Sequence, residues 1–421
     1  MTPPPSVAVV ADDLTSAGDG AAPFHLAGLP ARISLGAADP APAGAVTAVD
    51  CDTRTRTAAA AADRTAQATR RLAAADVLVK TVDSTVRGHL AAEISAALAA
   101  GGRTTAVIAP AFPAEGRSTV GGVQHLAGVP VHRTAFARDP GHPVRDADLT
   151  RLVPGAVLAE GPARLAELAG RTRYVVADAG SDRDLDEIVA AVARPRQVLW
   201  VGSPGLAEAL ARRLAPDREP ERTWPARRLP RGSRVLTVVG SLHPVSRGQA
   251  GRLGALNAGA MVPVTADHAA ERVERQLADH GTALLHGPPD RTAEGPVPEA
   301  LAAVVTRLAG RRAFDALVLT GGETARAVLD ALAVSHVRLA GQPEPGVPLG
   351  VVESPWRFPV ALKAGGFGDL DTLVRLNDLL TTSPLTEDPC APWPSPWATR
   401  PASDRRSPSN SSPTRGATPP S

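Results

Sequence analysis

The sequence predicts an α/β protein made of two α/β domains with mainly parallel sheets. Three observations support this prediction. Short apolar runs, such as residues 7–11, recur along the chain, and such runs are typical of strands buried on both faces of a parallel sheet. Helical segments alternate with these runs. A charged stretch rich in proline, residues 217–232, interrupts the alternation, which starts again after it.

In the first part of the chain, the predicted strands lead into polar loops or helices. Helices are predicted over residues 55–75, 90–100 and 206–214, where alanine, leucine and arginine are frequent. The strands are predicted at residues 7–11, 76–79, 105–109, 174–179 and 197–205.

After the interruption, the alternation of strand and helix returns. We therefore predict a first α/β domain over residues 1–216, a linker over 217–232 and a second α/β domain over 233–380. Residues 381–421 are dominated by Pro, Ser, Thr and Arg, which predicts a disordered tail. The strands of the second domain are predicted at residues 234–241, 261–264, 283–286 and 316–320.

The composition excludes several classes of partner. The 45 basic and 43 acidic residues nearly balance, and no basic stripe is interleaved with aromatic residues, so we expect no nucleic-acid partner. Cys51 and Cys390 show no metal-ligand spacing, which indicates a reducing compartment. No apolar run reaches the ~20 residues that span a bilayer, and residues 1–6 lack a signal-peptide pattern. We expect a cytoplasmic protein with no membrane partner. The sequence leaves open whether the protein forms a homodimer.

The densest group of polar side chains lies at residues 79–89, directly after a predicted strand. It contains Lys80, one of only two lysines in the chain; the other is Lys363. Arginine supplies all the remaining basic residues. The two lysines are therefore expected to have a role that a guanidinium does not fill, such as placing a compact positive charge beside a phosphate or a substrate oxygen.

Polar residues at two predicted strand ends favour a site for a small polyhydroxy acid. Carboxylates there would bind sugar hydroxyls, and the arginine fork would bind a substrate carboxylate. The alternatives are structural: Asp12 or Asp13 as a helix N-cap, and Asp83 with Arg87 as an ion pair worth ~0.3–0.5 kcal/mol if exposed. The candidate residues of this site are Asp12, Asp13, Lys80, Asp83, Ser84 and Arg87.

Two glycine-rich loops in the second domain suggest a nucleotide. Residues 321–324 (Gly-Gly-Glu-Thr) join a strand to a helix, whose first amides can bind a phosphate. Residues 363–368 bring Lys363 to a second such loop. The alternative for each loop is a tight turn that needs glycine. Neither loop fits the P-loop or the dinucleotide-binding pattern.

Several motifs, taken together and in order, resemble those of the four-carbon acid sugar kinase family, whose members phosphorylate threonate, erythronate or 3-oxo-tetronate with ATP. The resemblance extends over residues 7–380. The chain has Ser16 and Gly366 where the family usually has glycine and asparagine. The motifs are residues 11–15, 80–89, 109–113, 116–122, 321–324 and 363–368.

The resemblance implies that residues 1–216 form a sugar-acid-binding domain and residues 233–380 a nucleotide-binding domain, with the active site in the cleft between them. It places Asp12, Asp13, Lys80, Asp83 and Arg87 in the sugar-acid site. The residues that it assigns to ATP are Ser241, Gly321, Gly322, Glu323, Thr324 and Gly365, which Lys363 is predicted to join.

We therefore predict an ATP-dependent kinase that phosphorylates the terminal hydroxyl of a four-carbon sugar acid in carbohydrate acid catabolism. ATP and Mg²⁺ are the expected cofactors, and Asp12 or Asp13 is the expected base for the hydroxyl proton. One alternative is a sugar-acid dehydrogenase or isomerase that uses another phosphate-bearing cofactor. The other is a sugar-acid sensor without catalysis.

Overall fold

The computed structural model describes residues 5–36, 38–139, 142–215, 234–256, 261–288 and 297–382. We call residues 5–215 the N-terminal half and residues 234–382 the C-terminal half. The predicted linker, residues 217–232, lies outside the described residues, as does the predicted tail from residue 383 onward.

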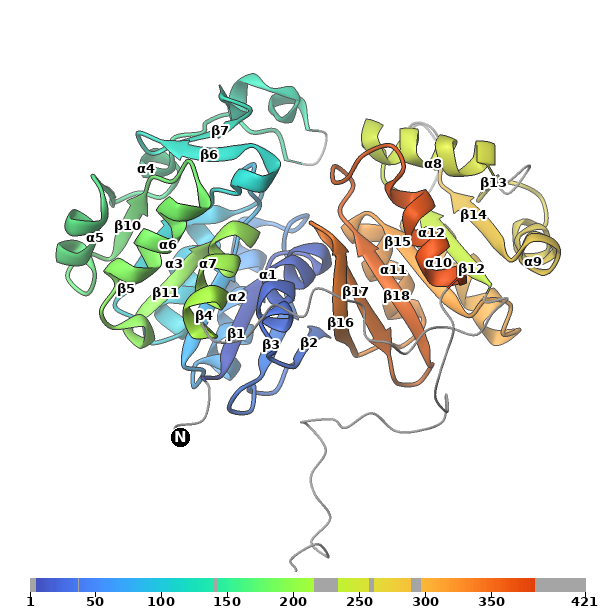
Figure 1. Cartoon of the computed structure of the whole chain (residues 1–421), viewed down its shortest axis with the longest axis horizontal. Helices are drawn as coiled ribbons and strands as arrows, with labels where there is room; N and C mark the ends of the chain where they lie inside the picture. The colour runs from blue at the N-terminus through green and yellow to red at the C-terminus, as the bar shows by residue number, and fades with distance from the viewer. Residues whose placement is uncertain are drawn as a thin grey trace, which may run out of the picture.

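Among the described residues, fifteen strands form one sheet. This sheet runs through both halves (Figure 1). The order is β13-β14-β12-β15-β18-β17-β16-β2-β3-β1-β4-β11-β5-β10-β9. Neighbouring strands are parallel except in the pairs β16–β17, β17–β18 and β16–β2. The strands of the N-terminal half are β1 (Val7–Ala11), β2 (Ala31–Leu35), β3 (Val46–Asp50), β4 (Val77–Thr81), β5 (Thr105–Ala109), β9 (Ala156–Ala159), β10 (Tyr174–Ala177) and β11 (Val198–Gly202). Those of the C-terminal half are β12 (Val235–Val239), β13 (Met261–Pro263), β14 (Thr282–His286), β15 (Ala316–Thr320), β16 (His336–Glu344), β17 (Val347–Val352) and β18 (Phe358–Lys363).

Helices pack on this sheet, and most of its central strands are buried along their whole length. In the N-terminal half the helices are α1 (Leu14–Leu26), α2 (Ala58–Leu72), α3 (Leu90–Ala100), α4 (Leu149–Leu152), α5 (Pro162–Leu168), α6 (Asp182–Ala191) and α7 (Pro204–Leu214). In the C-terminal half they are α8 (Pro244–Leu256), α9 (Ala269–His280), α10 (Val297–Gly310), α11 (Gly322–Ala331) and α12 (Thr372–Thr382).

The predicted α/β class is confirmed, and the structure adds a feature that the sequence did not predict. The strands of the two halves are joined into one sheet by the antiparallel pairing of β2 with β16, in which Ile33 lies opposite Val337. Each of these strands would otherwise be an edge with unpaired backbone groups. Their pairing removes both edges.

Helix α1 packs against both halves at this join. It contacts β1, β2 and β3 on one side and β16, β17 and β18 on the other. The packing is close, because a Cβ atom on Gly20 would come within 2.9 Å of Val9. Buried side chains from the two halves, including Val9, Ile33 and Val337, belong to one hydrophobic core. The loop that precedes α1 is therefore fixed by the surrounding core.

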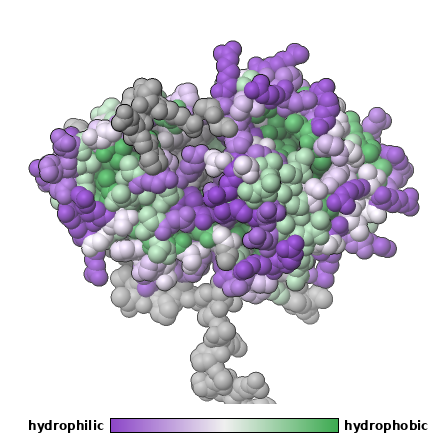
Figure 2. Space-filling view, turned by 180° about the vertical axis from the view of Figure 1, so that it is seen from behind, coloured by the Kyte–Doolittle hydropathy of each residue, from purple (hydrophilic) through white to green (hydrophobic). Residues whose placement is uncertain are grey.

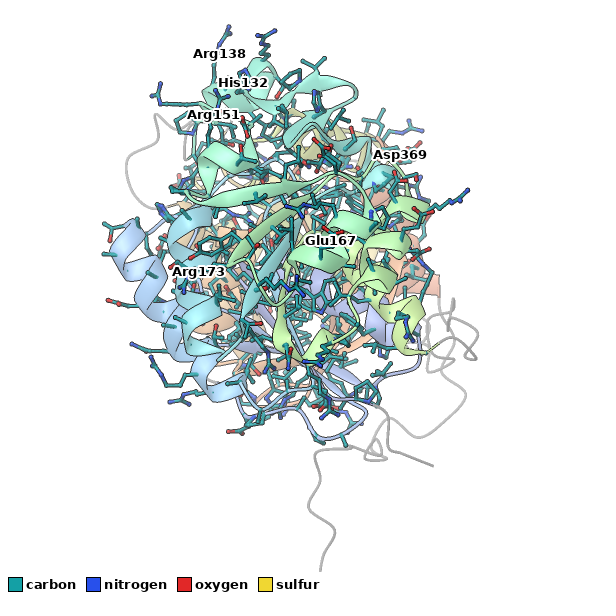
Figure 3. The ribbon with its side chains drawn as sticks, turned by 90° about the vertical axis from the view of Figure 1, so that its left-hand side faces the viewer. His132, Arg138, Arg151, Glu167, Arg173 and Asp369 are labelled. Atoms are coloured by element: carbon teal, nitrogen blue, oxygen red, sulfur yellow. The ribbon has the colours of Figure 1, made fainter. Side chains whose placement is uncertain are left out.

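A small antiparallel sheet is added to the N-terminal half. It consists of β6 (Arg117–Val120), β7 (Val123–Leu126) and β8 (Val129–Pro130), and two short 3₁₀ helices follow it, η2 (Val131–Arg133) and η3 (Ala135–Arg138). His132, Arg138 and Arg151 lie at this end of the molecule (Figure 3). The segment after β8 carries Phe136 to the site described below.

None of the described helices has the length and apolarity needed to cross a lipid bilayer. Hydrophilic side chains are spread over the face seen from behind, with apolar patches between them (Figure 2).

Candidate functional site

The polar cluster of the N-terminal half forms at the carboxyl ends of neighbouring parallel strands. Asp12 follows β1, and Asp83 comes shortly after the end of β4. In the register of the two strands, Val10 lies opposite Lys80, so the residues that follow meet at the same edge of the sheet. The structure thus brings Asp12, Asp83 and Lys80 together, as the sequence predicted.

Arg54 lies at the centre of this cluster, and the sequence prediction missed it. Its Nε donates to Asp12 Oδ2 at 2.8 Å, its Nη1 donates to Asp13 Oδ2, and its Nη2 donates to Ser16 Oγ at 3.0 Å. Burial favours the neutral form of Asp12, yet the positive charges of Arg54 and Lys80 outweigh it and lower the pKa of that carboxyl. Ser16, which stands where the family usually has glycine, therefore adds a hydrogen bond that orients the Arg54 guanidinium.

Asp13 has two roles in the structure. Its Oδ1 caps α1 by accepting hydrogen bonds from Ser16 N at 2.7 Å and Thr15 Oγ1 at 3.0 Å, so the N-cap interpretation is correct. Its Oδ2 accepts from Arg54 and lies against the C-terminal half, because a Cβ atom on Gly322 would be only 2.9 Å from it. Asp13 therefore places a carboxylate of the N-terminal half against the predicted nucleotide loop.

Lys80 is fully buried and already has an ionic partner. Its Nζ donates to Glu93 Oε2 at 2.7 Å and to the Thr81 carbonyl oxygen at 2.7 Å. Burial alone would lower the pKa of Lys80, but the negative charges of Glu93 and Asp12 raise it, so the ammonium stays charged. The structure gives Lys80 a structural role, and its contact with a substrate stays a prediction.

Arg87 completes the N-terminal cluster. Its Nε and Nη2 donate to the two oxygens of Asp83 at 2.9 and 3.0 Å. The local ion pair that the alternative interpretation predicted is therefore present. Its Nη1 donates to Asp139 at 3.3 Å, and its guanidinium lies 5.2 Å from the centre of the Phe136 ring. Burial opposes ionisation of Asp83, but Arg87 and Arg54 hold its pKa well below the usual range.

Ser84, the remaining candidate of this cluster, is buried. Its carbonyl oxygen accepts a hydrogen bond from Gln124 Nε2 at 2.8 Å, which ties the loop after β4 to the small added sheet. Its contact with a substrate stays a prediction.

The nucleotide candidates of the C-terminal half also meet at strand ends. Strands β15 and β18 are parallel neighbours in which Thr320 lies opposite Lys363, so both glycine-rich loops leave the same edge of the sheet. A Cβ on Gly321 would lie 3.4 Å from Ser241 Cβ, and one on Gly365 would clash with Ser241 Oγ. The close approach explains the glycine at 365, whereas the one at 321 is explained by its φ of 98°. Ser241 thus lies beside both predicted glycines.

The first turn of α11 is open to an anion. Its N-cap, Gly321, has a φ of 98° and no side chain to cap the helix, so no side-chain cap hydrogen bond is made there. Thr324 is buried in this turn, whereas Glu323 is exposed. Uncapped amides at a helix start favour a phosphate.

Lys363 lies beside this turn. It is buried, and its Nζ donates to the Ala364 carbonyl oxygen at 2.9 Å and approaches Ser246 Oγ at 3.5 Å. Burial lowers the pKa of Lys363 to about 8, against the opposing effect of Glu344. Unlike Lys80, it has no carboxylate within ion-pair distance among the described residues. Its charge is thus less compensated than that of Lys80.

The two halves also meet around the second glycine-rich loop. The Phe367 ring lies 6.4 Å from the Phe112 ring and 5.1 Å from the Arg117 guanidinium, centre to centre. A groove beside it is lined by Glu115 of the N-terminal half and by Gly366, Gly368 and Arg375, among others, of the C-terminal half. The candidate site therefore has walls from both halves.

Gly366, the second departure from the family pattern, lies against a histidine. A Cβ at this position would be 3.3 Å from His243 Nε2, so a larger side chain would press on the ring. Burial, with the positive charges of Arg87 and Lys363, lowers the pKa of His243. A neutral imidazole therefore occupies the place beside this loop.

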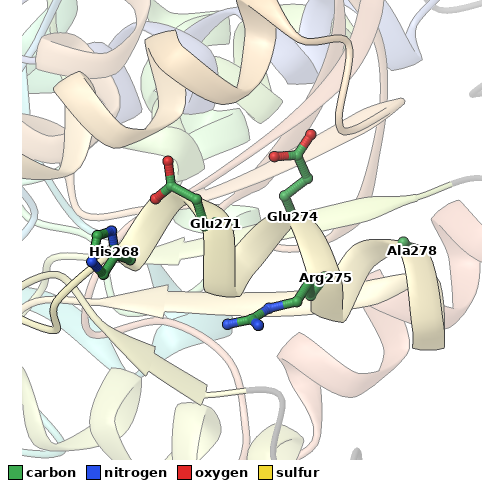
Figure 4. A pocket seen from close by; sticks show the side chains of 5 residues that line it. All are labelled: His268, Glu271, Glu274, Arg275 and Ala278. Carbon is green, nitrogen blue, oxygen red and sulfur yellow. The ribbon is translucent and has the colours of Figure 1, made fainter.

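A second surface depression lies elsewhere, along α9. Its lining comes from one stretch of chain, His268 to Ala278, and includes Glu271, Glu274 and Arg275 (Figure 4). It contains none of the predicted site residues. Because both carboxylates are engaged by nearby arginines, we interpret it as an ordinary helix surface.

Comparison with a solved structure supports the fold. The crystal structure of a Haemophilus influenzae protein superposes with a TM-score of 0.66 at 22% identity, and the match covers 86% of this chain and 97% of that chain. Residues 7–210 match a family described as a sugar-binding N-terminal domain, and residues 236–373 match one described as a nucleotide-binding C-terminal domain. The class is therefore a two-part α/β protein whose first portion matches the sugar-binding family and whose second portion matches the nucleotide-binding family.

Two relatives define the family more closely. A D-threonate kinase of Bordetella bronchiseptica is 37% identical, and the match covers 88% of this chain and 96% of the relative. A 3-oxo-tetronate kinase of Methylobacterium radiotolerans is 30% identical, and the match covers 88% of this chain and 98% of the relative. The chain belongs to the four-carbon acid sugar kinase family, and the resemblance seen in its motifs is confirmed.

Proposed function

We propose that this protein is an ATP-dependent kinase that phosphorylates the terminal hydroxyl of a four-carbon sugar acid, namely threonate, erythronate or 3-oxo-tetronate, in carbohydrate acid catabolism. One observation carries the proposal: the Asp13 carboxylate lies against Gly322, the first residue of α11. A carboxylate suited to accept a hydroxyl proton thus adjoins a helix start suited to hold a phosphate. The names of the relatives support the same reaction.

The N-terminal cluster would bind and orient the acid. Arg87 and Arg54 offer forked donors for its carboxylate, and the Asp12 and Asp13 oxygens would accept hydrogen bonds from its hydroxyls. Asp13 is our choice of base because it faces the C-terminal half. Proton acceptance by a positioned carboxylate contributes roughly 10²- to 10⁴-fold to such reactions.

The C-terminal loops would hold ATP. The open turn of α11 and the Lys363 ammonium would provide positive potential for the phosphates of ATP. Ser241 lies beside Gly321, at the start of this turn, and beside Gly365. Mg²⁺ would neutralise phosphate charge, and such ions are commonly held by phosphates with one or two carboxylates. Asp12 fits this role, because its Oδ1 is buried without a hydrogen-bond partner among the described residues.

The substrate screen is the direct test. Purified protein is incubated with ATP, Mg²⁺ and each four-carbon acid, and ADP release and the phosphorylated acid are measured. We expect ADP release that depends on one or a few of these acids. ATP binding without turnover on any of them would contradict the substrate assignment.

The same assay separates the two alternatives. A dehydrogenase or isomerase would convert the acid without ADP release, and the missing dinucleotide pattern argues against the first of these. A sensor would bind the acid tightly without phosphate transfer. A homodimer and a cytoplasmic location stay predictions, which light scattering and cell fractionation would test.

Replacing Gly322 by alanine is expected to reduce turnover roughly tenfold or more, because misplacement by 1 Å in a site can cost up to ~10²-fold. The new Cβ would lie 2.9 Å from Asp13 Oδ2, so the carboxylate or the helix has to move. Gly251→Ala in α8 is the matched control, since no other part of the described chain lies within 4 Å of its Cβ position. Steady-state kinetics and thermal melts are compared. Full activity of Gly322→Ala would show that this contact is not needed.

Lys363 is expected to set the alkaline limit of activity. With a pKa of about 8, its ammonium is charged below that pH and neutral above it. We expect kcat/KM for ATP to fall above about pH 8, and Lys363→Arg to remove this fall because a guanidinium stays charged. The variant should also raise the KM for ATP. A pH profile at saturating acid tests this, and an unchanged alkaline fall in Lys363→Arg would contradict it.

A further inference from the structure

A buried ion pair joins the two halves. Arg326 Nη1, on α11, donates to Asp50 Oδ2, at the end of β3, over 2.9 Å and across 276 positions of sequence. The Asp50 side chain is 1% exposed and that of Arg326 is 16% exposed. Asp50 Oδ1 accepts from the backbone N–H of Asp52 at 2.7 Å. Both carboxylate oxygens are therefore satisfied only while α11 is docked on the N-terminal half.

The pair lies one helical turn from the proposed reaction centre. Gly322 and Arg326 are four residues apart on α11, so they lie on the same face of the helix. Gly322 meets Asp13 after β1, and Arg326 meets Asp50 at the end of β3. These strands are parallel neighbours in which Ala11 lies opposite Asp50. Helix α11 thus docks across two adjacent strand ends.

A second carboxylate orients the guanidinium. Arg326 Nε donates to Asp330 Oδ2 at 2.7 Å within α11. This leaves Nη1 directed at Asp50. Asp330 is half exposed and belongs to the C-terminal half, so it acts on the contact between the halves only through Arg326.

Stability alone does not account for the pair. Burial raises the pKa of Asp50 to about 6, against the lowering effect of Arg326. Since this pKa is raised above that of an unfolded chain, the ionised carboxylate at neutral pH opposes folding instead of favouring it. Buried ion pairs in general are weak sources of stability, and fixing one arrangement of the chain is another use for them.

We propose that Asp50 and Arg326 are positioning residues that set α11 against the N-terminal cluster, so that a phosphate at the helix start is aligned with a hydroxyl at Asp13. The inference rests on the proposed kinase function. It predicts that losing the pair misaligns the two substrates without abolishing the binding of either one, because each is bound mainly by its own half.

The test compares Asp50→Asn, Arg326→Gln, the double variant and Asp330→Asn. We expect each cross-half single variant to lower kcat roughly 10- to 100-fold, with both KM values within about threefold of the parent. The double variant should be no worse than the more affected single variant, since both remove one interaction. Asp330→Asn weakens only the orientation of Arg326, so it should lower kcat less than either cross-half variant does, and Arg326→Lys should recover part of the activity.

The melting temperature separates positioning from folding. Each variant is assayed well below its own Tm, so that a loss of kcat is measured on folded protein; Arg326→Lys, which keeps a positive charge opposite Asp50, keeps the test informative if Arg326→Gln does not fold. Parent-like kcat in both single variants, or a kcat loss explained by unfolded protein, would overturn the inference. Failure of the proposed function is a different result, because the parent itself would then turn over none of the acids.

Discussion

Asp13→Asn is expected to lower kcat roughly 10²- to 10⁴-fold, the range typical of a lost general base. The amide is the same shape as the carboxylate but is a far weaker base. Helix α1 should still be capped, because asparagine is as good an N-cap as aspartate and can accept the bond from Ser16 N. Arg54 keeps its 2.8 Å contact with Asp12. The measurement is kcat and both KM values at saturating ATP, with Tm recorded alongside.

Asp12→Asn is the companion variant, because Asp12 shares Arg54 and is the other candidate base. If Asp13→Asn retains more than about a tenth of the parent kcat, Asp13 is not the base. Inactivity of Asp12→Asn would then fit either proton acceptance or Mg²⁺ binding by Asp12, and a higher Mg²⁺ requirement of this variant would identify the second. If neither change affects kcat, neither carboxylate accepts the proton. Asp13→Ser, which keeps a capping oxygen without a carboxylate, should behave like Asp13→Asn if the effect is chemical.

Local sequence patterns predicted the strand ends that carry the site. The apolar runs at 7–11, 105–109 and 316–320 became β1, β5 and β15, and residues 90–100 became α3. In each case the element is determined by residues that are close together in the sequence, so the local pattern is enough to predict it. The same reasoning would have pointed to the loop of Arg54, because β3 is also a mostly apolar run that ends on a carboxylate, Asp50.

The contacts between the halves could not be predicted in this way. An alternating or apolar strand shows which of its faces is buried, but not which distant strand pairs with its edge, and β2 with β16 is such a case. The pair Asp50 and Arg326 likewise depends on the docking of α11. The ion-pair partner of Lys80 could not be predicted either, because it depends on how α3 packs. This packing brings Glu93 to the lysine on β4.

Lys80→Met is expected to produce the largest loss of stability, about 3–5 kcal/mol, the usual cost of breaking a buried ion pair by removing one partner. The change leaves the Glu93 carboxylate buried without its cation. Such a loss is a large part of the roughly 5–15 kcal/mol that typical domains possess. Because the pKa of Lys80 is raised above its unfolded value, its contribution should be fully present at neutral pH and lost only as the pH rises past the usual lysine range.

Denaturant unfolding at neutral pH measures this effect, and a double variant identifies its cause. Lys80→Met with Glu93→Gln removes both charges, so it should be less destabilised than the sum of the single variants. Arg183→Met is the matched surface control: Arg183 pairs with Glu187 at 3.0 Å but is 86% exposed, so its loss should cost at most about 1 kcal/mol. Equal, small losses for Lys80→Met and Arg183→Met would mean that Glu93 finds another partner or takes up a proton. In that case Lys80 would be free of its structural role, and its predicted contact with the sugar acid would become the reason for a lysine at this position.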